Sequence, residues 1–359
     1  MNLLKNTTIG NFALKNRMVM APMTRSRADE NGVVGDLTVL YYTQRAGAGL
    51  IISEGINISE QALGSPWTPG IYSKEQIEAW KKVTQSVHDK GGLIFAQLFH
   101  SGRVGHSIDK KGDLPVAPSA VAISGQQHFT SEGLKDYEVP RALTTAEIKQ
   151  IVKDYKQAAI NAIEAGFDGV ELHAAFGYLP NEFLSESANQ RTDEYGGSVE
   201  NRNRFVIEVM KELADAVGEG KAAIKLSPTN TYNSIENSDP EAQFVPLIKE
   251  LNKLPLTYIH LMNAMTPLDS HPQYPKNVME TFGKVAEHPV IANAGYNRET
   301  GEEELKRGIA DLISYGVLFL ANPDLPIRFE KGAELNKPDR DTMFGGGEHG
   351  YTDYPFLGS

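Results

Sequence analysis

The chain has 359 residues, of which 40% are hydrophobic and 23% charged, a composition typical of a globular protein with a sizeable core. Its 46 acidic and 35 basic residues give a net charge of −11, without any lysine- or arginine-rich run. This balance argues against binding to nucleic acid or to an anionic membrane surface. No cysteine is present, which excludes disulfides, zinc–thiolate sites, iron–sulfur clusters and thiol nucleophiles.

Targeting and membrane-spanning segments are not evident. The first residues carry no charged segment followed by an apolar stretch, as a signal peptide would. No run approaches the roughly 20 apolar residues that cross a bilayer. We therefore expect a cytoplasmic protein.

Short apolar runs alternate along the chain with longer amphipathic ones. Most of the short runs are continuously apolar, which predicts strands buried on both faces of a parallel sheet. The eight predicted strands cover residues 17–20, 50–53, 93–98, 169–173, 222–227, 258–262, 289–293 and 311–315.

Helical patterns lie between these strands. The clearest covers 145–165, where apolar residues recur at spacings of three and four, Thr144 and Glu147 can form a capping box, and Gly166 ends the pattern. A second apolar stripe runs from Val206 to Val217. The other predicted helices cover 37–46, 74–90, 240–251, 275–286 and 300–308.

Eight strands alternating with helices predict a single (β/α)₈ TIM barrel that occupies residues 1–359 as one domain. A doubly wound sheet is the alternative, but the turn after the first strand is not a glycine-rich phosphate-binding turn. Residues 8–15 are predicted to form an N-terminal hairpin that caps the barrel. A long insertion follows strand 3, between residues 98 and 145, and we expect it to cover the active site.

Polar residues follow several predicted strands at the end where barrel enzymes place their active sites. A metal hydrolase is one interpretation, but His100 and His106 lie in one loop without a carboxylate at a metal-binding spacing. A Schiff-base aldolase is another, because Lys225 lies in an apolar strand where burial would lower its pKa. Pairing of that lysine with a carboxylate or a bound anion is the simpler interpretation.

A third interpretation uses the end of strand 4. His173 ends that strand, and Tyr178 follows five residues later at the start of a loop. The pair could bind a carbonyl oxygen and deliver a proton, since a phenol with a pKa near 10 keeps its proton at neutral pH. A packed loop tyrosine explains Tyr178 equally well on these grounds alone.

Motifs along nearly the whole chain resemble those of the Old Yellow Enzyme family of FMN-dependent ene-reductases. The matching segments are 21–28 (APMTRSRA), 41–46 (YYTQRA), 68–72 (TPGIY), 97–103 (QLFHSGR), 115–120 (PVAPSA), 191–198 (RTDEYGGS), 321–326 (ANPDLP) and 350–355 (GYTDYP). The resemblance implies bound FMN, NADPH or NADH as reductant, and a ping-pong transfer of hydride to an activated alkene.

The resemblance also assigns roles to individual residues. It implies that His173 donates to the carbonyl or nitro oxygen of the substrate and that Tyr178 protonates the α-carbon, as in an oxyanion hole. Thr24 occupies the position that carries a cysteine in one branch of the family. The implied flavin contacts are Pro22, Met23, Thr24, Gly55, Gln97, Lys225, Ala294, Gly295, Gly316 and Val317, and the implied substrate pocket consists of His173, Phe176, Thr24, Phe99 and Phe344.

Several of these positions depart from the family pattern. Phe176 stands where the family usually has a second donor, Asn or His, and Phe99 replaces a usual Trp, while Phe344 stands for a usual Tyr. Lys225 replaces an arginine beside the flavin and lacks its bidentate fork. Val317 replaces an arginine that usually clamps the FMN phosphate, which leaves backbone amides near the helix starts to hold it.

The resulting prediction is an NAD(P)H-dependent flavin oxidoreductase that reduces activated C=C bonds of unsaturated carbonyl or nitro compounds. The alternative is a paralogue that binds flavin or an aromatic ligand with weak ene-reductase activity, because of Phe176 and Val317. The expected partners are a small-molecule substrate and no nucleic acid or membrane, in a monomer or weak homo-oligomer.

Overall fold

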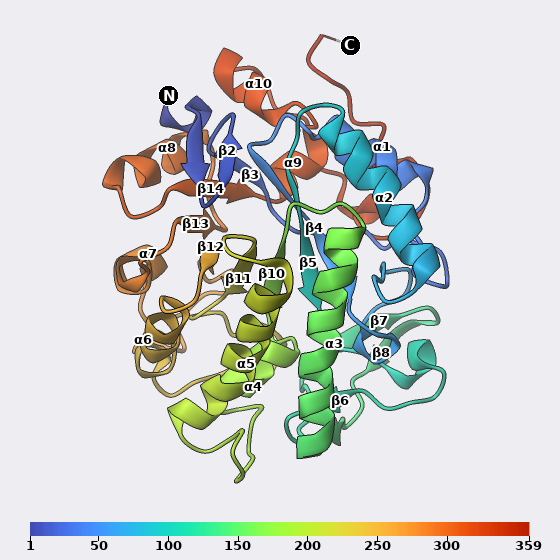
Figure 1. Cartoon of the computed structure of the whole chain (residues 1–359), viewed down its shortest axis with the longest axis vertical. Coiled ribbons are helices and arrows are strands. Elements are labelled where there is room, and N and C mark those ends of the chain that lie inside the picture. Colours follow the sequence, from blue (N-terminus) through green and yellow to red (C-terminus); the bar gives the residue numbers. More distant parts are fainter. Residues whose placement is uncertain (359) are drawn as a thin grey trace.

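Eight parallel strands close into a barrel in the computed structural model, which describes residues 1–358 (Figure 1). Each barrel strand pairs with the next barrel strand along the chain, and the pairing of the last strand, β14, with the first, β3, completes the ring. This confirms the predicted (β/α)₈ barrel and all eight of its strands. The barrel strands are β3 (Met18–Met20), β4 (Leu50–Asn57), β5 (Ile94–Phe99), β10 (Gly169–Ala174), β11 (Ala222–Leu226), β12 (Leu256–Met262), β13 (Val290–Asn293) and β14 (Leu312–Tyr315).

Strand β4 extends four residues beyond its predicted end at residue 53. Its pairing with β5 changes register between Ile52 and Gly55, which marks a bulge. Glu54 and Gly55 therefore lie inside the strand, whereas the sequence placed them after it. An irregular pairing of this kind depends on the neighbouring strand, so the apolar pattern of β4 alone does not reveal it.

Helices cover the outside of the barrel, and most begin where the sequence predicts. Thr144 and Glu147 form the expected capping box at the start of the long helix α3. The helices are α1 (Asp36–Gln44), α2 (Lys74–His88), α3 (Thr145–Glu164), α4 (Leu179–Leu184), α5 (Val199–Val217), α6 (Pro240–Leu251), α7 (Val278–Thr281), α8 (Arg298–Arg307), α9 (Val317–Ala321) and α10 (Leu325–Lys331). Short 3₁₀ turns cover Asn2–Leu4, Glu60–Ala62, Ser107–Lys110, Tyr232–Ser234, Gly283–Val285 and Arg340–Thr342.

The helix predicted over 275–286 is wrong in length. Helix α7 covers only Val278–Thr281 and is followed by a single 3₁₀ turn. The side chain of Asn277 accepts a hydrogen bond from the Glu280 amide and so starts the helix late. Gly283 lies so close to Ile309 that a β-carbon there would stand 2.8 Å from it, and this packing interrupts the helical pattern.

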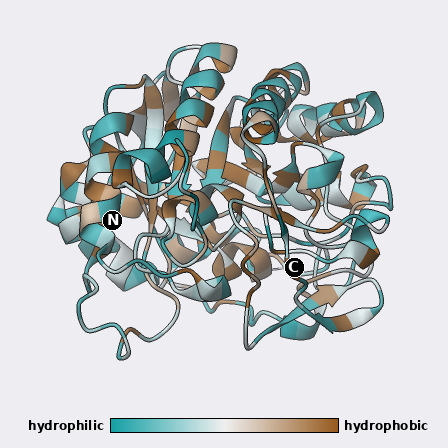
Figure 2. Cartoon of the chain, turned by 90° about the horizontal axis from the view of Figure 1, so that it is seen from below, coloured by the Kyte–Doolittle hydropathy of each residue, from teal (hydrophilic) through white to brown (hydrophobic). Residues whose placement is uncertain are grey.

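The inside of the barrel has two layers of different chemistry. Alternation along each strand turns every second side chain inward. The lower layer is apolar and packs against the N-terminal hairpin of β1 (Thr7–Ile9) and β2 (Phe12–Leu14), which closes this end of the barrel. Above it lie buried polar side chains from seven of the eight strands, all except β3. In Figure 2 hydrophobic stretches run along the central strands, while the surrounding helices carry hydrophilic and hydrophobic bands.

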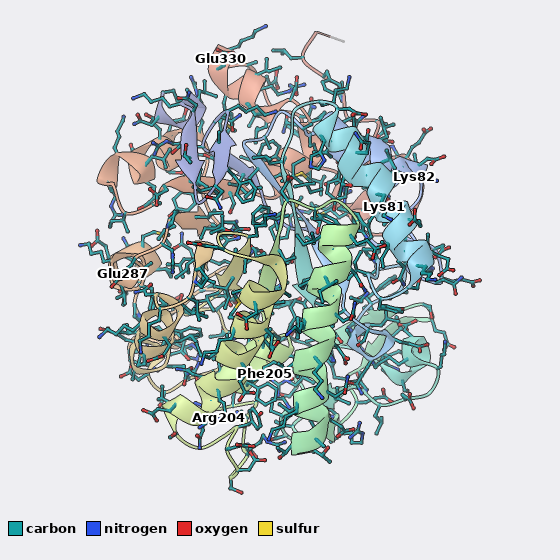
Figure 3. All side chains as sticks on the ribbon, viewed as in Figure 1. Lys81, Lys82, Arg204, Phe205, Glu287 and Glu330 are labelled. Atoms are coloured by element: carbon teal, nitrogen blue, oxygen red, sulfur yellow. The ribbon has the colours of Figure 1, made fainter. Side chains whose placement is uncertain are left out.

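The outer core lies between the barrel and its helices. Phe205 of α5 stacks on Phe183 at 4.3 Å between ring centroids and meets Tyr155 of α3 edge-on at 6.5 Å. Figure 3 shows Phe205 between these helices, whereas Lys81 and Lys82 of α2 project from the surface. None of the helices within residues 1–358 is long and apolar enough to cross a membrane.

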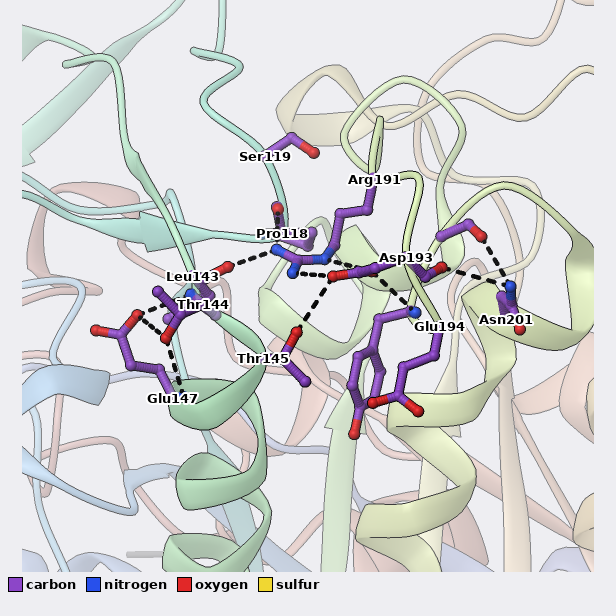
Figure 4. A network of polar contacts seen from close by, with 12 residues as sticks. Pro118, Ser119, Leu143, Thr144, Thr145, Glu147, Arg191, Asp193, Glu194 and Asn201 are labelled. Atoms are coloured by element: carbon purple, nitrogen blue, oxygen red, sulfur yellow. Dashed lines mark hydrogen bonds and ion pairs between the residues drawn. The ribbon is translucent and has the colours of Figure 1, made fainter.

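The insertion after β5 contains four short strands, β6 (Val116–Ala117), β7 (Gln127–Thr130), β8 (Gly133–Asp136) and β9 (Arg141–Ala142). Strands β7 and β8 form a hairpin, and β6 pairs with β9. Arg191 fastens the insertion to the barrel, because it donates to the carbonyl oxygens of Pro118 at 2.9 Å and Leu143 at 2.5 Å (Figure 4). The same guanidinium pairs with Asp193, which also accepts from Thr145 at the start of α3. The return of the insertion is thereby held at the end of the barrel where the loops follow the strands.

Candidate active site

A buried polar network crosses the upper layer of the barrel. Gln97 donates to Glu171 at 2.7 Å, and the other carboxylate oxygen of Glu171 lies 2.9 Å from Nδ1 of His260. Nε2 of His260 lies 2.8 Å from the hydroxyl of Ser314, which accepts from Asn293 at 2.7 Å. Burial alone would raise the pKa of Glu171, yet His260, Lys225 and Gln97 together hold it below its usual range. The carboxylate is therefore charged beneath the mouth of the barrel.

Lys225 is the buried cation of this layer. It pairs in register with His173 of β10 and with His260 of β12. No hydrogen bond or ion pair within 4 Å joins its ammonium to any residue that the structure describes, and Glu171 is the opposite charge that acts on it. Burial lowers the pKa of Lys225 to about 8. A buried ammonium without a hydrogen-bond acceptor is well suited to an anionic ligand above it.

His173 is neutral at physiological pH, with one ring nitrogen available to a ligand. Burial, and after it the charge of Lys225, hold its pKa well below the usual range. Its Nδ1 accepts a hydrogen bond from the Ala175 amide at 3.4 Å, which assigns the proton to Nε2. No residue in 1–358 accepts from that Nε2–H. His173 thus presents a neutral hydrogen-bond donor.

Tyr178 lies beside His173. Its ring meets that of His173 edge-on, with the centroids 4.9 Å apart. Its hydroxyl has no hydrogen-bond partner in the part of the chain that the structure describes. Burial, and after it the phenols of Tyr137 and Tyr232, raise its pKa above the usual value, so the hydroxyl keeps its proton at neutral pH. The structure therefore brings the two predicted catalytic residues together, each with a free donor.

Aromatic rings surround this pair. The ring of Phe99 lies 4.5 Å from that of Tyr178 and 5.7 Å from that of His173. Phe99 also covers Gly55, where an added β-carbon would stand 3.2 Å from the ring. The ring of Phe176 lies 6.5 Å from that of His173 between centroids. Phe99 and Phe176 thus form apolar walls around two polar donors.

The predicted flavin contacts surround the same end of the barrel. Pro22, Met23 and Thr24 are half-buried directly after the fully buried strand β3. Met23 packs against Gly316, where an added β-carbon would lie 3.1 Å from its sulfur. Val317 begins helix α9 and is 43% exposed.

The loop after β13 contains the other two predicted contacts. Ala294 and Gly295 both have a positive φ, of 72° and 82°. The carbonyl oxygen of Ala294 accepts a hydrogen bond from Asn263 at 3.1 Å, which fixes the turn. Ala294 therefore adopts a conformation that favours glycine, close to the first turn of α8.

Phe344 does not lie beside His173 and Tyr178. It is 61% exposed in the segment after the last 3₁₀ turn. No close ring contact within residues 1–358 joins it to His173, Tyr178 or Phe99. Nearby backbone packs on Ser26 and Trp67 instead. The prediction that Phe344 lines the pocket stays without support from a contact.

Sequence reasoning missed two kinds of site residue. Tyr137, after β8, and Tyr232, after β11, act electrostatically on Tyr178, and they reach the site from loops. The buried partners Glu171, His260, Ser314 and Asn293 were missed as a group. Their signal was present, since each is a polar residue inside an otherwise apolar barrel strand. No group of three or more metal-binding side chains occurs among residues 1–358.

Comparisons with known proteins show the family to which this chain belongs. The model of the NADH:flavin oxidoreductase / NADH oxidase family matches residues 2–336. The chain is 44% identical to 12-oxophytodienoate reductase 1 of Oryza sativa subsp. japonica, over 99% of this chain and 93% of the relative. It superimposes on the old yellow enzyme homologue of Zymomonas mobilis with a TM-score of 0.95 and 43% identity, covering 99% of each chain. Morphinone reductase gives a TM-score of 0.94 at 43% identity, over 99% of this chain and 96% of that one.

The barrel, the matched residues and these relatives define an FMN-dependent oxidoreductase that uses a nicotinamide cofactor as reductant. The chain belongs to the NADH:flavin oxidoreductase / NADH oxidase family and, within it, to the Old Yellow Enzyme family.

The residues at the barrel mouth fit a bound flavin in two respects. Lys225 offers a buried positive charge for which residues 1–358 provide no hydrogen-bond acceptor. The half-buried segment 22–24 leaves a surface uncovered directly above a buried strand. The phosphate end fits less closely, because Val317 brings no charge to it.

Proposed function

We propose that this protein reduces C=C bonds activated by a carbonyl or nitro group, with NADH or NADPH as the electron source, in a single FMN-binding domain. The observation that carries the proposal is the adjacent pair of free donors, the neutral imidazole of His173 and the protonated phenol of Tyr178. One donor binds an oxygen that gains negative charge, and the other supplies a proton.

We assign a role in the reaction to each of these side chains from its position. Bound FMN would supply the hydride chemistry between the nicotinamide and the β-carbon of the alkene. His173 Nε2–H holds the carbonyl or nitro oxygen and stabilises the charge that develops on it. Tyr178 delivers its hydroxyl proton to the α-carbon. Phe99 and Phe176 exclude water from the two donors.

We assign the flavin to the residues that line this end of the barrel. Gln97 of β5 and Lys225 of β11 lie in the polar layer on strands that flank β10, and Gly55 lies beneath Phe99. Thr24 is half-buried in the segment that follows β3, and we assign its hydroxyl to both flavin and substrate. The remaining proposed contacts are Pro22, Met23, Ala294, Gly295, Gly316 and Val317.

Anaerobic spectroscopy tests this function. The purified protein, supplied with FMN, is reduced with NADPH and then mixed with cyclohexenone or a nitroalkene. Reduction of the flavin followed by its reoxidation on adding the alkene is the expected result. A protein that gains no flavin absorbance after FMN is supplied would contradict the proposal.

A flavin- or aromatic-ligand-binding paralogue with weak ene-reductase activity is the second candidate. It is favoured by Phe176, which offers a ring rather than a donor, and by the uncharged Val317. Flavin that is reduced by NADPH but reoxidised by no enone or nitro compound would favour this candidate over the first.

Replacing Val317 by arginine is expected to tighten FMN binding. A hydrogen bond to a charged group contributes about 1.5–3 kcal/mol, which corresponds to a dissociation constant lower by about 10- to 100-fold. Titration of the flavin-free protein with FMN, followed by fluorescence, measures this effect. Riboflavin is the control, because it lacks the phosphate, and an equal gain with riboflavin would show that the arginine acts elsewhere.

FMN affinity is expected to fall as the pH rises above about 8. The pKa of Lys225 is about 8 because of burial, so its positive charge is lost through this range. If only the ammonium form binds strongly, affinity falls by up to about tenfold per pH unit above that pKa. FMN titrations between about pH 7 and about pH 9 measure the dependence. Lys225→Met removes the titrating group, and an unchanged pH profile in that variant would contradict the assignment.

A further inference from the structure

The backbone of Phe176 adopts a conformation that side chains with a β-carbon avoid. Its φ is +60°, in the left-handed region. Such residues persist only where their surroundings hold them, and they occur often at functional sites. The ring of Phe176 lies 6.5 Å from His173 and 6.0 Å from Tyr232, so its backbone conformation decides where one wall of the pocket stands.

Two buried side chains form hydrogen bonds with the backbone of Phe176. Its amide donates to the hydroxyl of Ser227 at 3.1 Å, and its carbonyl oxygen accepts from Nδ2 of Asn233 at 2.8 Å. Ser227 and Asn233 are both almost fully buried. The next residue, Gly177, approaches Asn233 so closely that an added β-carbon would lie 2.8 Å from the β-carbon of Asn233. The loop after β10 is therefore packed on and bonded to the loop after β11.

Asn233 belongs to a second left-handed turn, which is held in turn by Arg103. The φ values of Asn233 and Ser234 are +59° and +57°. One terminal nitrogen of Arg103 donates to the carbonyl oxygens of Asn233 at 2.9 Å and of Ser234 at 3.1 Å. The other terminal nitrogen donates to Val121 of the insertion at 3.1 Å.

Arg103 also contacts helix α4, which begins directly after Tyr178. Its backbone amide donates to Glu182 of α4 at 2.7 Å. One buried residue thus connects the insertion, the turn at 232–234 and the helix of the catalytic tyrosine. These hydrogen bonds join loops around the site and do not involve the strands of the barrel. We therefore expect Arg103 to position these loops as well as to stabilise the fold.

The turn has space to move if it is released. A polar cavity of about 380 Å³ lies beside it and is lined by Arg103, Val121, Thr231 and Ser234, among others. Loss of the hydrogen bond from Asn233 to Phe176 would remove one of the bonds between the two left-handed segments, and the turn at 232–234 could then shift toward this cavity.

We propose that Asn233 and Arg103 are positioning residues that hold Phe176 in its left-handed conformation and thereby fix the aromatic wall that receives flat, ring-bearing ligands beside His173 and Tyr178. The proposal rests on the proposed function for the identity of the pocket. Beyond that function, we propose that the position of the Phe176 ring depends on Asn233 and Arg103, two side chains that do not contact the ligand.

A double-mutant comparison tests whether Asn233 and Arg103 hold Phe176 in this way, and we call these two residues the clamp. Asn233→Gly removes the Nδ2 donor, while glycine keeps the positive φ without cost. In the native background we expect the dissociation constant of a para-substituted phenol, measured by calorimetry on the flavin-loaded protein, to rise about five- to tenfold. In the Phe176→Asn background the same change should be at most about twofold, because asparagine adopts the left-handed region more readily than phenylalanine.

Asn161→Gly is the matched control. Asn161 is also buried and donates from Nδ2 to a backbone carbonyl oxygen, that of Ile71, at 2.8 Å, but it lies in α3, away from the site. Its loss should lower the melting temperature without changing phenol affinity. Equal losses of affinity from Asn233→Gly in both Phe176 backgrounds, or none in the native one, would overturn the proposal.

Arg103→Lys provides a second variant if Asn233→Gly does not fold. Lysine keeps the charge but cannot bond the turn and the insertion at once. Weakened phenol binding with a native-like circular dichroism spectrum supports the clamp, and unchanged binding contradicts it. Calorimetry needs no turnover, so a protein that binds the phenol but reduces no alkene overturns the proposed function and leaves the clamp standing.

Discussion

Tyr178→Phe is expected to lower the rate of alkene reduction by about 10²- to 10⁴-fold, the usual contribution of a positioned general acid. Burial keeps the pKa of Tyr178 high, so its proton is present at neutral pH, and the hydroxyl is bonded to no other residue in 1–358. The ring would keep its edge-on packing on His173 and Phe99 in the variant. The loss should therefore fall on proton transfer rather than on binding.

Stopped-flow measurement of the two half-reactions separates these effects. Flavin reduction by NADPH needs no proton from Tyr178, so its rate should stay within about threefold of the native rate. Such a change is much smaller than the loss of rate that removal of a general acid causes. Reoxidation by cyclohexenone should slow by the full factor. Tyr155→Phe is the control, since it removes a different buried hydroxyl, in α3, that has no hydrogen-bond partner among residues 1–358. Equal reoxidation rates for Tyr178→Phe and the native protein would show that another group supplies the proton.

The architecture was predictable because it depends on local patterns. Each barrel strand is a short apolar run, and the amphipathic stripe and capping box of α3 lie within one stretch of chain. The end of β4 and the shortened helix α7 were not predictable, because each depends on a distant segment. The bulge at Gly55 needs the register of β5, and the interruption at Gly283 needs the side chain of Ile309.

The site divides in the same way. His173, Tyr178 and Lys225 were identified because their types and their places at strand ends already suggest chemistry. Gln97 was predicted as a flavin contact, but its partners Glu171 and His260 were not identified, because this network joins three strands far apart in the sequence. Backbone conformation was equally hidden, and nothing in the sequence around Phe176 indicates a positive φ at a phenylalanine.

Phe176→Asn is expected to raise the rate of enone reduction by about 10²- to 10³-fold, the effect of one oxyanion-hole donor. Asparagine would add an amide N–H near His173, so that two donors meet the oxygen where one does now. The change carries little backbone cost, because asparagine is among the residues that tolerate φ of +60°. It also leaves the backbone bonds of residue 176 to Ser227 and Asn233 available.

Phe176→Leu separates the new donor from the loss of the ring. Leucine widens the pocket without adding a hydrogen bond, so its effect on kcat for cyclohexenone should remain within about fivefold of native, far below the effect of a donor. A gain in rate with asparagine but not with leucine would mean that the rate depends on how well hydrogen-bond donors stabilise the negative charge on the substrate oxygen. Equal gains in both variants would mean instead that the phenylalanine ring obstructs the substrate, and the assignment of position 176 as a missing donor would be wrong.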